Sequence, residues 1–317
     1  MSVYTTVGRT ELAAWLEPLA LGALSDFAGI AAGMQNSNYF VTAGGVRRVL
    51  TVFEHLTPAQ LDFYLALMAH LAAHGIPCPQ PLAAADGSLW RPLAGKPAAL
   101  LSCLPGADLE NPVAQDCRVL GATLARLHLA AADFADPLPN PCGAAWRQRV
   151  GGELAPRLSA KERGQLLNEL EFQAAQDYSL LPRGVIHGDL FRDNVLWQAG
   201  KLTGVLDFYF AGEDALLFDL AVVANDWCVE ADSLPALVSG YCSFRPICDL
   251  EARSWLAPLQ KPLYGGRRPY VSGCCGSRFA NAHGLVKSSR SRIPTILGIF
   301  CSNSALLRQN SPVSIWI

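Results

Sequence analysis

The sequence predicts an α+β protein with two lobes, the first built on an antiparallel sheet and the second mainly helical. At 317 residues the chain is longer than one hydrophobic core usually supports, so it should divide into about two domains. β-Branched and aromatic runs between turn signals mark residues 1–105, and apolar residues at helical spacing mark residues 106–251. We expect one lobe over each range, then an atypical basic tail over residues 252–317 that is not natively folded.

The N-terminal lobe begins with a short helix and continues as a meander. Thr10 is a suitable N-cap for a helix that ends at Leu16. Three strands with a Gly-Gly hairpin signal between the last two are predicted over residues 27–33, 37–42 and 46–53. Thr57, Pro58 and Gln60 then have the pattern of a helix start. Two further strands follow, the last over residues 98–104.

The C-terminal lobe shows helix signals before and after a set of short strands. Helices are predicted from Asn111, from the capping box of Ser159 and Glu162, and over residues 214–229. The short strands are predicted over residues 185–186, 194–197 and 202–206. Asp219 lies inside the last helix, where a charge must be paired or hydrogen-bonded, so we expect it to support the backbone of a neighbouring loop.

Composition places the chain among folded globular proteins, with 51% hydrophobic and 16% charged residues. No apolar run reaches the roughly 18 residues of a membrane span, and no basic segment followed by an apolar one marks a secretory signal. The ten cysteines lack metal-ligand spacing, which favours reduced thiols. We therefore expect a cytoplasmic protein without a membrane partner.

Charge is distributed unevenly. All 27 acidic residues lie at or before Glu251, whereas nine of the 25 basic residues follow it, so the first 251 residues carry −11 and the remainder +9. A basic tail can bind nucleic acid or an anionic membrane. The tail is the sole feature that favours nucleic acid, and we expect no nucleic-acid partner.

The candidate catalytic and metal-binding residues lie between His187 and Asp207. A polar loop follows the strand at residues 185–186, and the two later strands return the chain, so Asp189, Asn194 and Asp207 are predicted to converge. Their oxygen atoms suit Mg²⁺, a hard cation that leaves room for phosphate oxygens. Asp189 instead suits the role of proton acceptor for an incoming hydroxyl. His187 is predicted to support the loop.

The spacing His-x-Asp-x-x-x-x-Asn followed by Asp-Phe is the arrangement that protein kinases use for phosphoryl transfer. The alternative is that the pattern reflects two hairpin turns that happen to be acidic. That alternative would account for an isolated Asp-Phe pair, but it accounts poorly for four motif residues in the right order. Earlier in the chain, the small residues around Gly33 let backbone N–H groups approach phosphates, and Asn36, Ser37 and Asn38 add donors. An ordinary Gly/Asn turn is the alternative there. The predicted fold is therefore bilobal and protein-kinase-like.

The chain resembles the aminoglycoside phosphotransferase and choline kinase superfamily of small-molecule kinases. Within it, the chain is most similar to the bacterial homoserine kinases of that fold. The stretches that carry the resemblance reach to about Glu251 and are residues 1–5, 29–41, 49–54, 95–98, 187–196, 206–209 and 225–228. The loop at residues 187–196 is highly specific for the superfamily.

The resemblance implies that the chain transfers a phosphoryl group from ATP, with Mg²⁺, to L-homoserine, giving O-phospho-L-homoserine on the route to threonine. It implies that Asp189 deprotonates the hydroxyl and that Asn194 and Asp207 hold the metal. The acceptor is a zwitterion, so Asp226 is a candidate for its ammonium, and Arg192 for its carboxylate or for the γ-phosphate. Solvated surface charges are the alternative for both residues.

Two features depart from the resemblance. Thr51 stands where kinases carry a phosphate-clamping Lys, and the next helix has no Glu to pair with one, which indicates a different clamp. Lys96 is either a substitute for that Lys or a solvated turn residue. The second departure is the tail. Homoserine kinases typically have an Ala-Leu-Arg-Phe-Trp-Leu helix here, and a one-base shift in codons for residues 269–274 gives this string, so we hypothesise an out-of-frame tail.

Other functions stay open at this point. One alternative is a kinase of the same superfamily for an aminoglycoside, choline or a thiosugar. Another is an inactive nucleotide-binding pseudokinase, which the missing Lys and the unusual tail favour.

Overall fold

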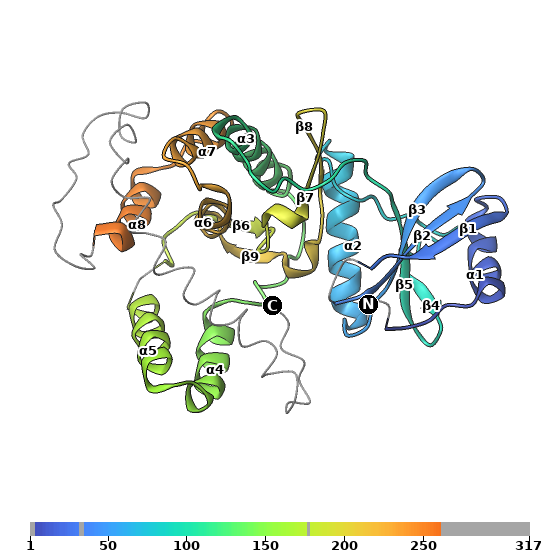
Figure 1. The fold of residues 1–317 in the computed structure, drawn as a ribbon, viewed down its shortest axis with the longest axis horizontal. Coiled ribbons are helices and arrows are strands. Elements are labelled where there is room, and N and C mark those ends of the chain that lie inside the picture. Colours follow the sequence, from blue (N-terminus) through green and yellow to red (C-terminus); the bar gives the residue numbers. More distant parts are fainter. Residues whose placement is uncertain (1–3, 32–34, 176–177, 261–317) are drawn as a thin grey trace. The chain divides into compact units, whose positions relative to one another are not determined.

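The computed structural model describes residues 4–31, 35–175 and 178–260 of the chain (Figure 1). The chain divides into two compact units. The first comprises Met1–Asp108 with Val195–Tyr209, and the second comprises Leu109–Asn194 with Phe210–Ile317. The first unit is therefore discontinuous, a feature for which the sequence pattern offers no signal.

The first unit contains a five-stranded antiparallel sheet in the order β1-β2-β3-β5-β4 (Figure 1). Its strands are β1 (Leu24–Gly29), β2 (Ser37–Ala43), β3 (Val46–Val52), β4 (Arg91–Leu93) and β5 (Lys96–Ser102). The predicted three-strand order is confirmed, with a hairpin at Gly44 and Gly45, whose φ angles are 58° and 76°. The first strand was placed too late: it covers Leu24–Gly29 rather than residues 27–33.

One face of this sheet packs against α1 (Arg9–Leu16), which is followed by the 3-10 turn η1 (Glu17–Leu19). The core on this face contains Leu12 and Leu16 from the helix and alternate residues of the strands, among them Tyr39, Val41 and Leu50. The predicted N-cap at Thr10 is wrong. Gly8, with an extended backbone, is the N-cap, and it makes no side-chain capping bond because glycine has no side chain.

The helix α2 (Pro58–Ala73) lies between β3 and β4 in sequence, and its capping box is confirmed. The backbone N–H of Gln60 donates to Thr57 Oγ1 at 3.4 Å, and the N–H of Thr57 donates to Gln60 Oε1 at 3.0 Å. Gly75, with a φ of 75°, follows its last turn.

The first unit also contains the hairpin of β7 (Val195–Gln198) and β8 (Lys201–Val205). Val195 pairs with Val205, and the hairpin attaches to the segment after β5 through reciprocal backbone bonds between Ala107 and Trp197. The predicted strand–turn–strand pattern is confirmed. The 3-10 turn η4 (Phe208–Phe210) follows Asp207.

The second unit is mainly helical and contains a two-stranded sheet. Its helical elements are α3 (Ala114–Ala130), α4 (Ala144–Leu154), η2 (Ala155–Arg157), α5 (Ala160–Ala174), η3 (Arg192–Asn194), α6 (Leu216–Trp227), α7 (Ser233–Cys242) and α8 (Asp249–Gln260). In the sheet, β6 (Arg183–Ile186) pairs antiparallel with β9 (Gly212–Ala215). The capping box at Ser159 is confirmed at the start of α5.

The helices α3 and α7 approach each other closely, side by side in Figure 1. Glycine makes this approach possible. A Cβ atom on Gly240 would lie 1.9 Å from the carbonyl oxygen of Arg118, and one on Gly121 would lie 2.1 Å from that of Leu237. Any larger residue at either position would force the two helices apart.

Three predicted boundaries in this unit are wrong. The first long helix starts at Ala114 rather than Asn111, after an extended Val113. The helix predicted from residue 214 starts at Leu216, because residues 212–215 pair with β6. The tail was expected to begin without helical structure, but α8 continues to Gln260. Glu251 stabilises its start by accepting a hydrogen bond from the N–H of Cys248 at 3.0 Å.

The hypothesised out-of-frame segment at residues 269–274 lies outside the described residues. Within the described part of the chain, no helix has both the length and the apolar character that crossing a membrane requires.

Candidate active site

The loop after β6 is held by one buried carboxylate. Asp219 of α6 accepts hydrogen bonds from the backbone N–H groups of His187 at 2.6 Å and Gly188 at 2.7 Å. His187 and Asp219 are both fully buried. Two convergent donors on one carboxylate fix the backbone immediately before Asp189.

A histidine from α3 completes the shell around Asp219. His128 Nε2 lies 3.1 Å from Asp219 Oδ2, and His128 Nδ1 lies 2.8 Å from the hydroxyl of Tyr241. Burial alone would raise the pKa of Asp219, but the hydrogen bond and the charge of His128, with the neighbouring His187 and the Gly188 N–H, hold that pKa below its ordinary value. The carboxylate therefore stays ionised, as an acceptor of several donors requires.

Gly188 permits the tight path of the loop. Its φ is 79°, a left-handed conformation, and a Cβ atom there would lie 2.6 Å from the carbonyl oxygen of Phe210. The backbone N–H of Asp189 then donates to His187 Nδ1 at 3.2 Å. Together with the two bonds to Asp219, this bond fixes the backbone path that leads into Asp189.

Asn194 contacts Asp189 directly. Its side-chain amide donates to the backbone oxygen of Asp189 at 2.7 Å and to Asp189 Oδ2 at 3.0 Å. A carbonyl oxygen can only accept, so the contacting atom must be Nδ2, and Oδ1 is left for other partners. An amide oxygen next to a carboxylate is a suitable ligand for a hard divalent cation.

The two candidate acceptor-binding residues contact each other. Asp226, near the end of α6, accepts from the backbone N–H of Arg192 at 2.8 Å and pairs with its guanidinium at 3.3 Å. Arg192 also donates to the backbone oxygen of Glu110 at 2.9 Å. An adjacent cation and anion are complementary to a zwitterion, and both side chains remain partly exposed.

Asp207 belongs to the first unit, so its meeting with Asp189 and Asn194 stays a prediction. It follows β8 by two residues and has a φ of 60°. Asp tolerates this left-handed backbone better than most residues, and such conformations concentrate at functional sites. Gly33, predicted to contact phosphate, lies outside the described residues.

Thr51, predicted to stand where kinases carry the clamping Lys, contributes a neutral hydroxyl on β3. Thr51 Oγ1 on β3 donates to Asn38 Oδ1 on β2 at 2.8 Å. Tyr209 packs edge-on against Phe53 and Tyr64, with ring centroids 5.3 and 5.9 Å away. Burial and then the Asp207 carboxylate raise the pKa of the Tyr209 phenol, while its hydrogen bond with Thr51 acts in the opposite direction. Sequence reasoning did not single out Tyr209, because its link to Thr51 is a hydrogen bond formed only in the folded chain.

The other predicted phosphate-loop residues face different surroundings. Ser37 is fully buried on the α1 face, where its Oγ accepts from the backbone of Tyr4 and Thr5 and donates to Glu54 Oε1 at 2.6 Å. The Asn36 side chain accepts from the N–H of Glu54 at 3.4 Å. The hydroxyl of Ser37 is therefore already engaged within the lobe.

Lys96 lies on the same face of the sheet as Ser37. Its ammonium pairs with Glu54, whose side chain is only 2% exposed. Lys96 alternates along β5 with Ala98 and Leu100, which are core residues of the α1 face, whereas Thr51 pairs with the intervening Ala99. Successive strand residues point to opposite faces, so Lys96 is not a positional substitute for the missing Lys.

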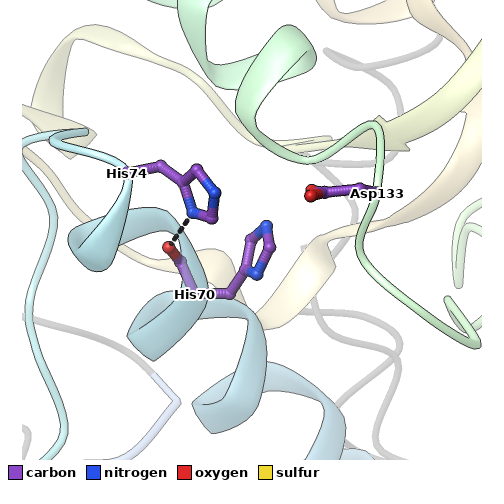
Figure 2. A group of neighbouring side chains, drawn as sticks. All are labelled: His70, His74 and Asp133. Atoms are coloured by element: carbon purple, nitrogen blue, oxygen red, sulfur yellow. Dashed lines mark hydrogen bonds between the residues drawn. The ribbon is translucent and has the colours of Figure 1, made fainter.

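Two histidines of α2 are close together outside the predicted site (Figure 2). The ring centroids of His70 and His74 are 4.2 Å apart, and His74 Nδ1 donates a hydrogen bond to the carbonyl oxygen of His70 at 2.8 Å. Asp133, also drawn in Figure 2, belongs to the second unit. Two histidines on one helix supply fewer ligands than a protein metal site uses, and they carry no functional assignment.

Comparison with known proteins gives a consistent result. The model of the phosphotransferase enzyme family matches residues 26–259. A homoserine kinase from Methylobacillus flagellatus is 46% identical over 266 residues, covering 82% of this chain and 83% of its own. A homoserine kinase from Cupriavidus pinatubonensis is 44% identical over 291 residues, covering 86% and 87%.

The fold has solved counterparts. The structure of an amicoumacin kinase, bound to AMP-PNP and Ca²⁺, superposes with a TM-score of 0.57 at 16% identity, covering 73% of this chain and 76% of that one. At this identity the similarity concerns the fold alone, and it confirms the predicted α+β, protein-kinase-like class. The chain therefore belongs to the phosphotransferase enzyme family, and the two relatives named above are homoserine kinases.

Proposed function

We propose that the chain phosphorylates the hydroxyl of L-homoserine with ATP, giving O-phospho-L-homoserine and ADP on the cytoplasmic route to threonine. The observation that carries this proposal is the 46% identity to a homoserine kinase over more than four-fifths of both chains. The hydrogen-bonded pair of Asp189 and Asn194 supports it, because two of the four residues of the kinase motif are in contact.

In this proposal Asp189 accepts the proton of the homoserine hydroxyl as the hydroxyl oxygen attacks the γ-phosphorus. The bond between the γ-phosphorus and the bridging oxygen of ADP breaks as the new bond forms. Asp219 positions the loop through His187 and Gly188, so the base is held before the substrate arrives. Positioning of this kind supplies a large share of phosphoryl-transfer catalysis.

A divalent cation, for which we propose Mg²⁺, fits the oxygen donors Asn194 Oδ1 and the Asp207 carboxylate. When bound, it supplies positive charge that neutralises the nucleotide phosphates. The loop around Gly33 and the neighbouring Asn38 and Thr51 are assigned to the nucleotide. From Asn36 and Ser37 we expect backbone rather than side-chain contacts, since both side chains already have partners.

The acceptor is recognised by charge. We assign the ammonium of homoserine to Asp226 and the γ-phosphate to Arg192. Their ion pair would loosen as each group takes its own partner, at a modest cost for a partly exposed pair.

An ADP-release assay over L-homoserine, choline and kanamycin tests the proposal. We expect turnover with homoserine alone. Preferential turnover of kanamycin or choline would show another kinase of the superfamily, and ATP binding without turnover of any acceptor would show a pseudokinase. Either result would overturn the proposed function.

A further inference from the structure

Arg147 of α4 is a half-buried cation with no carboxylate in ion-pair contact among the described residues. Burial lowers the pKa of its guanidinium, and the more distant Asp214 carboxylate offsets part of that effect. Its guanidinium donates to the backbone oxygen of Cys142 at 2.8 Å and lies over the ring of Phe218, 5.7 Å from the centroid. Within the described residues this is its one side-chain hydrogen bond, and it forms no ion pair within 4.0 Å. A guanidinium has five N–H donors, so most of them are left for another partner.

The loop that contacts Arg147 is fixed beside the catalytic loop through β9. The N–H of Asn140 donates to the backbone oxygen of Glu213 at 3.2 Å, and its side-chain amide donates to Asp214 at 2.8 Å. Gly212 packs so closely that a Cβ atom on it would lie 2.8 Å from the backbone of Asn140. Gly212 is also the strand partner of Ile186, which immediately precedes His187.

The second contact of Arg147 leads to the same loop. Phe218 directly precedes Asp219, whose carboxylate holds the backbone of His187 and Gly188. Each contact of the Arg147 guanidinium is therefore linked to the catalytic loop. Cys142 is linked through the bonds between its loop and β9, and Phe218 is linked through the adjacent Asp219. Burial, and then the Asp189 carboxylate, raise the pKa of the Cys142 thiol to about 12, which indicates that Asp189 lies within electrostatic range of this loop.

Arg192, a cation of the catalytic loop itself, is differently placed. Its guanidinium is engaged by both oxygens of Asp226 and by the backbone of Glu110. Among the described residues Arg147 has no ion pair of this kind, and burying a charge without a close counter-ion is costly unless a ligand later pairs with it. The forked geometry of a guanidinium matches a carboxylate in particular.

We propose that Arg147 binds the carboxylate of the acceptor and thereby makes the enzyme select an amino acid over the corresponding amino alcohol. This inference rests on the proposed function and extends it to a residue outside the kinase motif. It completes the recognition of the zwitterion, with Asp226 at the ammonium, Asp189 at the hydroxyl and Arg147 at the carboxylate.

The test compares two acceptors that differ only by the carboxylate, L-homoserine and 3-amino-1-propanol. We expect Arg147→Met to raise the KM for homoserine roughly 10- to 100-fold, the loss of a hydrogen bond to a charged group, and to leave kcat/KM for 3-amino-1-propanol within about twofold. Arg147→Lys should recover part of the homoserine effect, because it keeps the charge and loses the fork. Arg149→Met on the same helix is the control, since Arg149 is exposed and paired with Glu153.

The outcomes separate the two claims. An unchanged KM for homoserine in Arg147→Met, or an equal loss with both acceptors, would overturn the assignment of Arg147 and leave the proposed function intact. If the wild-type chain does not phosphorylate homoserine, the proposed function fails, and this inference with it. The KM for ATP in each variant checks that the fold is preserved.

Discussion

The side-chain amide of Asn194 donates to both the backbone oxygen and the carboxylate of Asp189. This contact gives the two residues linked roles. The amide nitrogen orients the proton acceptor, and the amide oxygen is left for a cation. Asn194 can therefore orient the base that accepts the proton of the acceptor hydroxyl and also hold the cation that contacts the phosphates.

Asp189→Asn should lower kcat by about 10³-fold, because it removes the proton acceptor while preserving size. Nucleotide affinity should change by less than about threefold, since the base contacts the acceptor rather than ATP. Steady-state kinetics and calorimetric titration with AMP-PNP measure the two effects. Retention of wild-type kcat would exclude Asp189 as the base.

Asp219→Asn should reduce the free energy of unfolding by about 3 kcal/mol, because a buried carboxylate with three donors becomes an amide that opposes one of them with its own N–H group. Urea unfolding measures the change. Glu153→Gln, at an exposed ion pair of α4, serves as control and should shift the value by less than about 0.5 kcal/mol. Equal effects of the two substitutions would contradict the role of Asp219.

Acid should destabilise the wild-type chain more than Asp219→Asn. The pKa of Asp219 is lowered in the folded state, so its contribution is complete above the ordinary Asp pKa of about 3.9 and is lost as pH falls towards the lowered value. The Tm difference between the two proteins should therefore be constant from pH 5 to 7 and shrink below about pH 4. A difference that grows on acidification would contradict the sign of this shift.

Lys96→Met should affect stability rather than nucleotide binding. The substitution leaves the buried Glu54 without its cation, at a cost of about 1–2 kcal/mol, a moderate value because Lys96 is 39% exposed. The KM for ATP should stay within about twofold, since Lys96 faces the α1 side of the sheet. A tenfold rise in that KM without loss of stability would instead make Lys96 the phosphate clamp.

Thiol labelling should distinguish the cysteines by burial. Burial raises the pKa of Cys78 and Cys142 to about 12, so at pH 8 only about one part in 10⁴ of each is thiolate, the reactive form. Cys248 is exposed. Iodoacetamide followed by mass spectrometry should modify Cys248 first and Cys78 and Cys142 much more slowly. Early modification of Cys142 would contradict its placement.

Local signals made part of the fold predictable. The capping boxes at Thr57 and Ser159 lie within a few residues of the helices they start, and both helices form as predicted. The strand β9 was missed because its sequence, Gly-Glu-Asp-Ala, has little strand character and its partner β6 lies about 30 residues earlier. Its pairing depends on contacts that no local pattern shows.

The candidate site divides in the same way. The motif residues Asp189, Asn194 and Asp207 are recognised by spacing along the chain, whereas the significance of Arg147 depends on its contacts with Cys142 and Phe218. Lys96 is the opposite case. Its sequence position leaves its role open, and the register of β5 places it on the face away from Thr51.

The most direct test of the central claim is a crystal structure of the chain with AMP-PNP, Mg²⁺ and L-homoserine. We predict one metal ion bound by Asn194 Oδ1 and the Asp207 carboxylate, with the homoserine hydroxyl within hydrogen-bond distance of Asp189. A nucleotide bound elsewhere, or a metal ion that neither residue contacts, would contradict the account.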